Sequence, residues 1–81
     1  MDLAEIENRL KQLLPKYRET IPAGQIEDMI ELVSAGEPGI ALENFCTQLY
    51  EYSIKVDDED LNTIILLGKA MKIDPEHWEG L

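Results

Sequence analysis

The stretch that decides the fold is Gly36–Tyr52, which reads GEPGIALENFCTQLYEY. Its glycine predicts a turn and its proline suits a helix start. At about 100° per residue, the apolar residues that follow gather on one side of a helix and the polar residues gather on the other. The apolar side holds Ala41, Leu42, Phe45, Cys46, Leu49 and Tyr52, and the polar side holds Glu43, Asn44, Thr47 and Glu51. Tyr50 lies at the border, beside Glu43 and Thr47. The stretch therefore predicts a helix with one core face and one face free for binding.

Two stretches before this helix also repeat apolar residues at helical spacing. The first begins at Asp2 and should run to about Leu14, because Pro15 removes a backbone donor and disfavours helix just before it. Residues 15–20 then form a turn or a short frayed helical turn. The second helix opens with Pro22 at its first position and stops at Gly36 in a left-handed conformation. With almost no linker between them, the second and third helices should form a tight corner or an antiparallel hairpin.

Two further elements are expected after Tyr52. Residues 53–56 predict an extended loop that directs Ile54 and Val56 inward, and Asp57 caps a fourth helix over residues 58–72. That helix is apolar around much of its circumference, so it should be the most buried one. In the tail, Asp74 and Pro75 signal a final helical turn, and Trp78 should cover the core. The sequence therefore predicts an all-α fold: a single domain, residues 1–81, built as a compact four-helix unit with a short C-terminal helical turn.

The charge balance limits the classes of partner. Seventeen acidic residues stand against seven basic ones in 81 residues, which gives a net charge of −10. Nucleic acids and anionic membranes need clustered lysine and arginine, so both are poor partners, whereas a basic protein is a natural complement. No stretch approaches the roughly 20 apolar residues of a membrane span, and a cytoplasmic location is expected. The alternative reading of the acidity is that it serves solubility alone.

Residues for catalysis or metal binding are sparse. The one histidine, His77, lies in the tail, and the one cysteine, Cys46, lies on an apolar helix face, where a buried free thiol is expected. A zinc site needs several such ligands, and the acidic run 57–60 lacks the spacing of a calcium-binding EF-hand loop. We expect no catalytic residue, no metal and no cofactor. A small hydrolase that uses His77 and Cys46 stays open as an alternative.

The remaining candidate function is recognition of another protein. The outer face of the second helix carries like charges three and four residues apart, an arrangement that costs roughly 0.2–0.5 kcal/mol per pair in an isolated helix, with no lysine to offset it. If the second and third helices are neighbours, this face extends the polar side of the third. The predicted partner-binding residues are Glu27, Asp28, Glu31, Glu43, Thr47, Tyr50 and Glu51. A plain solvated acidic face with ordinary boundary tyrosines is the competing interpretation.

Residues 31–52, ELVSAGEPGIALENFCTQLYEY, and the closing IDPEHWEGL carry a family resemblance. They resemble the small immunity proteins of the MafI type, which are encoded beside bacterial polymorphic toxins of the Maf and contact-dependent growth inhibition (CdiA/CdiI) systems. The resemblance implies a cytoplasmic protein that binds the C-terminal toxin domain of a neighbouring cell's effector. When free, the protein is expected to be a monomer or a weak dimer. Several such toxins resemble EndoU-type, metal-independent RNases. The alternative from another class is an acidic helical adaptor that binds a basic protein unrelated to any toxin.

Overall fold

The computed structural model describes residues 1–81 as four α-helices and two short 3-10 helices, with no strand. The elements, in chain order, are α1 (Leu3–Leu13), η1 (Leu14–Tyr17), α2 (Ala23–Ser34), α3 (Pro38–Glu51), α4 (Asp58–Ala70) and η2 (Pro75–His77). The all-α prediction of four helices and a short C-terminal turn is confirmed. Residues 14–17 continue α1 as a 3-10 turn, because Pro15 has no N–H to donate to the carbonyl of Lys11.

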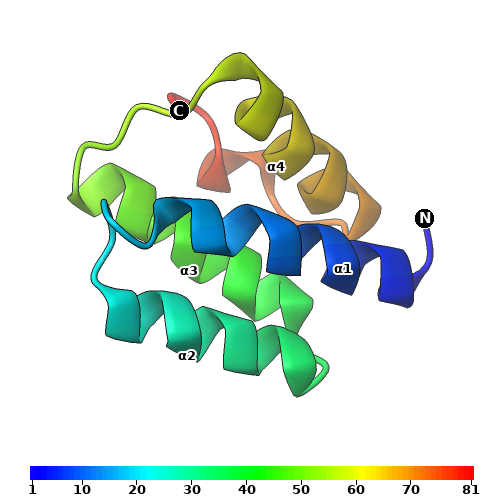
Figure 1. Cartoon of the computed structure of the whole chain (residues 1–81). Coiled ribbons are helices and arrows are strands. Elements are labelled where there is room, and N and C mark those ends of the chain that lie inside the picture. The colour runs from blue at the N-terminus through cyan, green and yellow to red at the C-terminus, as the bar shows by residue number, and fades with distance from the viewer.

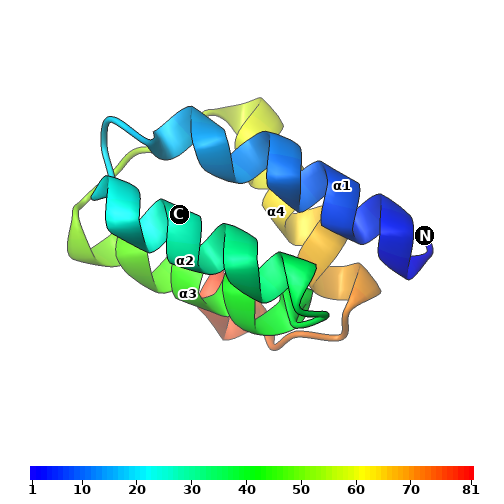
Figure 2. The same ribbon diagram turned by 60° about the horizontal axis from the view of Figure 1, so that its bottom comes forward.

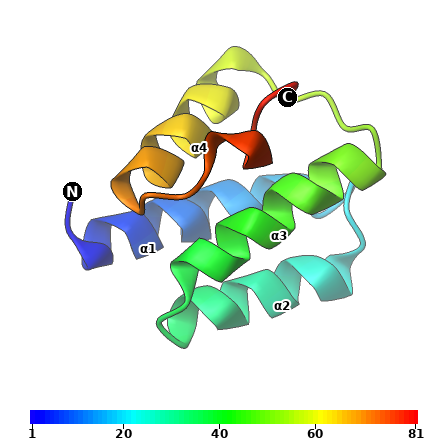
Figure 3. The same cartoon turned by 180° about the vertical axis from the view of Figure 1, so that it is seen from behind.

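Helices α1, α2 and α3 run back and forth, each antiparallel to the one before it (Figures 1 and 2). The closest-packed pair is the α2–α3 hairpin, as the short connection predicted. Helix α4 lies on the opposite side of α1 and α3 from α2 (Figure 1). Seen from behind, α3 lies between α2 on one side and η2 on the other (Figure 3). Helix α3 is therefore the central element of the fold.

The burial of side chains agrees with this central position. Helix α3 contributes the largest set of buried residues, namely Pro38, Ala41, Leu42, Phe45, Cys46 and Leu49. The ring of Phe45 meets that of Tyr17 edge to face, with the ring centroids 5.1 Å apart, a geometry that aromatic pairs prefer. The core side expected for residues 41–49 is confirmed.

Helix α4 is not the most buried helix, contrary to the sequence prediction. Its buried residues are Asp60, Ile64, Leu67 and Gly68, and Leu66 is 46% exposed. The helix lies at the edge of the bundle, so only one of its sides meets other elements, and a wide apolar circumference does not by itself place a helix at the centre.

Three further predictions about helix ends need correction. Tyr52 was expected on the core face but is 44% exposed, because α3 ends at Glu51, where the chain turns away from the core. Pro22 caps α2 with a non-helical ψ of 132° instead of occupying its first position. Helix α4 ends at Ala70, two residues before the expected Lys72.

Helices α2, α3 and α4 all end in the same hydrogen-bonded arrangement. In α2, the N–H of Glu37 donates to the carbonyl of Leu32 at 2.8 Å, around Gly36 with φ of 84°. This is the Schellman motif, in which a left-handed residue closes the helix. The left-handed stop predicted at Gly36 is confirmed. In α3 and α4 the left-handed positions are held by Ser53 and Lys72.

The C-terminal segment folds back onto the bundle through Trp78. Its ring is 7% exposed, and a Cβ built on Gly68 of α4 would lie within 2.9 Å of three of its ring carbons. Only a residue without a side chain allows this close approach. The prediction that Trp78 covers the core is confirmed.

Candidate functional site

The predicted binding residues lie on the α2–α3 hairpin but in distinct surroundings. Glu27 lies on the side of α2 that faces η1, where its Oε1 accepts a hydrogen bond from Arg18 Nε at 3.0 Å. The same oxygen forms an ion pair with Arg18 Nη2 at 2.8 Å. Both side chains are about half exposed. The charge of Glu27 is thus already compensated by Arg18.

Glu43 and Tyr50 lie on the side of α3 that meets the C-terminal tail, since Glu43 is near His77 and Tyr50 is near Gly80. Glu43 Oε2 is 3.4 Å from His77 Nε2, a separation that gives an ion pair when the histidine is protonated. The hydroxyl of Tyr50 lies against Gly80, although 44% of the residue is exposed. Partial burial, with Cys46 and Glu79 nearby, raises the pKa of Tyr50 above its usual value.

The other predicted residues point outward. Thr47 is exposed, and its hydroxyl donates to the carbonyl of Glu43 at 3.1 Å, within the helix. Asp28, Glu31 and Glu51 are exposed and take part in no ion pair. These three carboxylates are the uncompensated charges of the predicted surface.

A polar groove runs between α2 and α3. It has a volume of about 320 Å³. Of the predicted residues it contains only Asp28; its other lining residues are Gln25, Met29, Asn44 and Gln48. The side-chain oxygen Oε1 of Gln48 is buried there without a hydrogen-bond partner. Gln25 and Gln48 were not among the residues predicted from the sequence. Both amides lie at the border of their helical wheels, and that they line one groove becomes clear only when the relative position of α2 and α3 is known.

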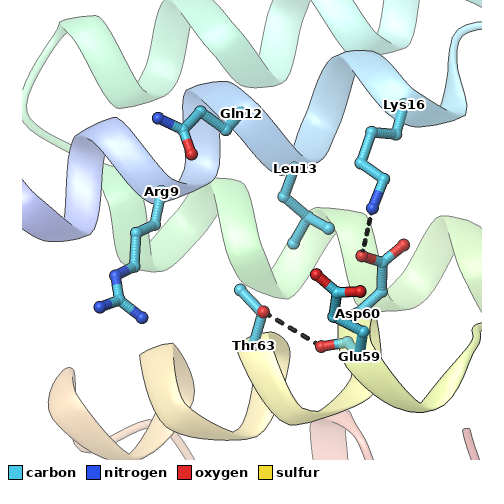
Figure 4. Close-up of a pocket in the computed structure, with 7 residues that line it drawn as sticks. All are labelled: Arg9, Gln12, Leu13, Lys16, Glu59, Asp60 and Thr63. Atoms are coloured by element: carbon cyan, nitrogen blue, oxygen red, sulfur yellow. Dashed lines mark hydrogen bonds and ion pairs between the residues drawn. The ribbon is translucent and has the colours of Figure 1, made fainter.

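A second groove lies between α1 and α4, as Figure 4 shows. Arg9, Gln12 and Lys16 line it from the α1–η1 side, and Glu59, Asp60 and Thr63 line it from α4. Its closest opposite charges are already paired, since Lys16 Nζ lies 2.7 Å from Asp60 Oδ1. This groove therefore offers no uniform charge to a ligand.

Asp60 is the one buried charged residue of the chain, and no sequence pattern indicated its burial. Its second oxygen accepts a hydrogen bond from the Tyr17 hydroxyl at 2.6 Å. Burial raises the pKa of Asp60, but the hydrogen bonds from Lys16 and Tyr17 lower it by more, so the net shift is downward. The Asp60 carboxylate thus fastens α4 to η1. Asp57 caps the same helix by accepting from the N–H of Asp60 at 2.7 Å, as the sequence predicted.

Cys46 is a buried free thiol, as expected. Burial, with a smaller effect of Glu43, raises its pKa to about 12. At physiological pH the thiol is protonated, whereas a nucleophilic cysteine needs its thiolate. Its position in the structure is that of a small core side chain.

Comparison with known proteins identifies no relative: no family model, curated protein or solved structure matches this chain. No helix has the length and apolar character needed to cross a bilayer. No group of three or more His, Cys, Asp or Glu side chains is placed to hold a metal ion.

Proposed function

We propose that this chain is a cytoplasmic immunity protein that binds the nuclease domain of a secreted bacterial toxin, of the EndoU-type RNase class, and occludes its basic cleft. The observation that carries the proposal is the charge of the α2–α3 hairpin. Residues 19–54 contain no lysine or arginine, and Asp28, Glu31 and Glu51 are exposed there without an ion-pair partner.

An RNase must hold phosphates, so its substrate cleft carries lysine and arginine. An acidic surface complements such a cleft, speeds association and competes with RNA for the same groups. Helix α3 also exposes Ile40 and Tyr50, which are 45% and 44% exposed. Interfaces use apolar and aromatic anchors of this kind at their centres. Charge and anchors on one hairpin support steric and electrostatic occlusion as the mechanism.

The direct test is co-expression with the toxin domain encoded by the adjacent gene. Cells that make the toxin domain should survive only when this protein is also made. Equal killing with and without the protein would refute the proposal.

Tyr50 provides a test at the level of the interface. Tyr50→Ala should weaken toxin binding by at least about 2 kcal/mol in titration calorimetry, as expected for a central anchor. Leu66→Ala is the matched control, because Leu66 is exposed to a similar extent but lies on α4. An unchanged affinity for Tyr50→Ala would remove Tyr50 from the interface.

A further inference from the structure

The groove between α2 and α3 contains acceptor oxygens that the protein itself does not use. Gln48 Oε1 is buried without a hydrogen-bond partner, and leaving a buried acceptor unpaired is unfavourable. The Asp28 carboxylate lines the same groove and is in no ion pair. The groove thus exposes one full negative charge on α2, and an unsatisfied acceptor of α3 is buried beside it.

The other lining residues fit a cation that brings hydrogen-bond donors. Gln25 and Asn44 add amide oxygens, and Met29, which is 2% exposed, adds an apolar contact. No basic side chain of the protein lines the groove. Its volume of about 320 Å³ is at the small end of ligand pockets, which span roughly 300–1,000 Å³. It can therefore take one long side chain.

We propose that this groove binds an arginine side chain of the protein partner. The guanidinium group is planar and carries five N–H donors, so it can pair with the exposed Asp28 carboxylate and, after the Gln48 side chain rotates its oxygen toward the groove, donate to that oxygen as well. Arginine is more weakly hydrated than lysine, which favours it at a partly buried acceptor. The inference rests on the proposed function for the identity of the partner, but the binding chemistry can be tested without it.

The first test uses blocked amino acids as probes, with the side-chain amide signals of Gln25, Asn44 and Gln48 followed by NMR. N-acetyl-arginine amide should shift these signals saturably at millimolar concentration. N-acetyl-lysine amide should bind at least about threefold more weakly, and N-acetyl-citrulline amide, which has a similar shape without charge, should cause no saturable shift. Equal shifts with arginine and citrulline, or with arginine and lysine, would overturn the assignment.

A matched pair of variants separates the groove from general electrostatics. Asp28→Asn and Glu31→Gln each remove one negative charge from α2, but only Asp28 lines the groove. We expect the first to weaken arginine-probe binding at least fivefold and the second less than twofold. Equal losses would show that the probe senses the net charge of the helix and not the groove.

The toxin domain then distinguishes this inference from the proposed function. Suppose that the protein neutralises the toxin, but that the Asp28→Asn and Gln48→Leu variants bind the toxin as tightly as the unmodified protein. The groove inference is then wrong and the proposed function stands. If the groove takes the arginine probe but no toxin domain binds, the proposed function is wrong and the groove stands. Support for both requires at least a tenfold loss of toxin affinity in Asp28→Asn.

Discussion

Replacing Gly68 by alanine tests the close contact that holds the C-terminal segment. In an ordinary helix interior this substitution stabilises by about 0.8–1.0 kcal/mol, because alanine is the better helix former. In α4, however, the new methyl group would lie within 2.9 Å of three ring carbons of Trp78. The ring is 7% exposed and has little room to move away. The substitution should therefore have the opposite sign from its usual one.

The size of the effect follows from two opposing contributions. Overpacking a core costs typically about 1–3 kcal/mol, and overlap with three atoms of a rigid ring places Gly68→Ala at the upper end. Subtracting the gain in helix propensity leaves a net loss of about 2 kcal/mol. Complete loss of Trp78 packing, about 3–5 kcal/mol, is the ceiling. For a domain of this size, 2 kcal/mol lowers the Tm by roughly 8–16 °C.

Urea unfolding followed by circular dichroism measures this loss, and fluorescence of the single tryptophan reports on the ring itself. Gly24→Ala on α2 is the control, since nothing lies within 4 Å of its new methyl group, and it should be neutral or stabilising. In a Trp78→Leu background, Gly68→Ala should become stabilising, because the overlapping ring carbons are gone. A Gly68→Ala protein as stable as the Gly24→Ala protein would refute the reasoning.

Three other predictions address charge, thiol chemistry and association. Tyr17→Phe should lower the free energy of unfolding by about 1–2 kcal/mol at pH 7 by removing the 2.6 Å hydrogen bond to Asp60. The pKa of Asp60 is lowered in the folded state, so this stabilisation is complete above the unfolded pKa of about 3.9 and is lost as pH falls through the folded pKa. Urea unfolding should therefore show a smaller difference in stability between the Tyr17→Phe and unmodified proteins at pH 2.5 than at pH 7. An equal difference at both pH values would contradict the prediction. Cys46, with its pKa raised to about 12, should react with a thiol reagent at pH 8 only when urea unfolds the chain, so rapid labelling of the folded protein would be inconsistent with its burial. Glu31→Lys should slow toxin association at low salt, because it replaces an exposed, unpaired carboxylate by a positive charge; stopped-flow rates that equal those of the unmodified protein, or that do not respond to added salt, would count against electrostatic steering.

The helices could be predicted from the sequence because their signals are local. The periodic apolar residues of 41–49, the cap at Asp57 and the stop at Gly36 act within one or two helical turns, and the structure confirms all three. Helix ends such as Tyr52 were harder to predict, because a helical wheel assigns a face to every residue, including those that follow the end of the helix. The burial of each helix depends on its position in the bundle, which is why α4 was misjudged.

The candidate site was less accessible to sequence reasoning because its features depend on pairs of residues far apart in the chain. The pairing of Lys16 and Tyr17 with Asp60 spans more than forty residues, and neither partner signals the other. The groove between α2 and α3 likewise joins Gln25 and Asp28 to Asn44 and Gln48, which no local pattern in the sequence brings together. Helical periodicity shows which residues face outward, but it does not show which outward residues meet.

Helix α3 separates two demands that compete in many small proteins. Its buried positions fix the core, whereas Asn44, Thr47 and Glu51 are all exposed. Substitutions at exposed positions usually change stability by less than about 0.5 kcal/mol. Mutation can therefore alter the outer surface of this helix, one residue at a time, while the chain goes on folding. A protein built in this way can follow a changing partner over evolutionary time without first having to rebuild its interior.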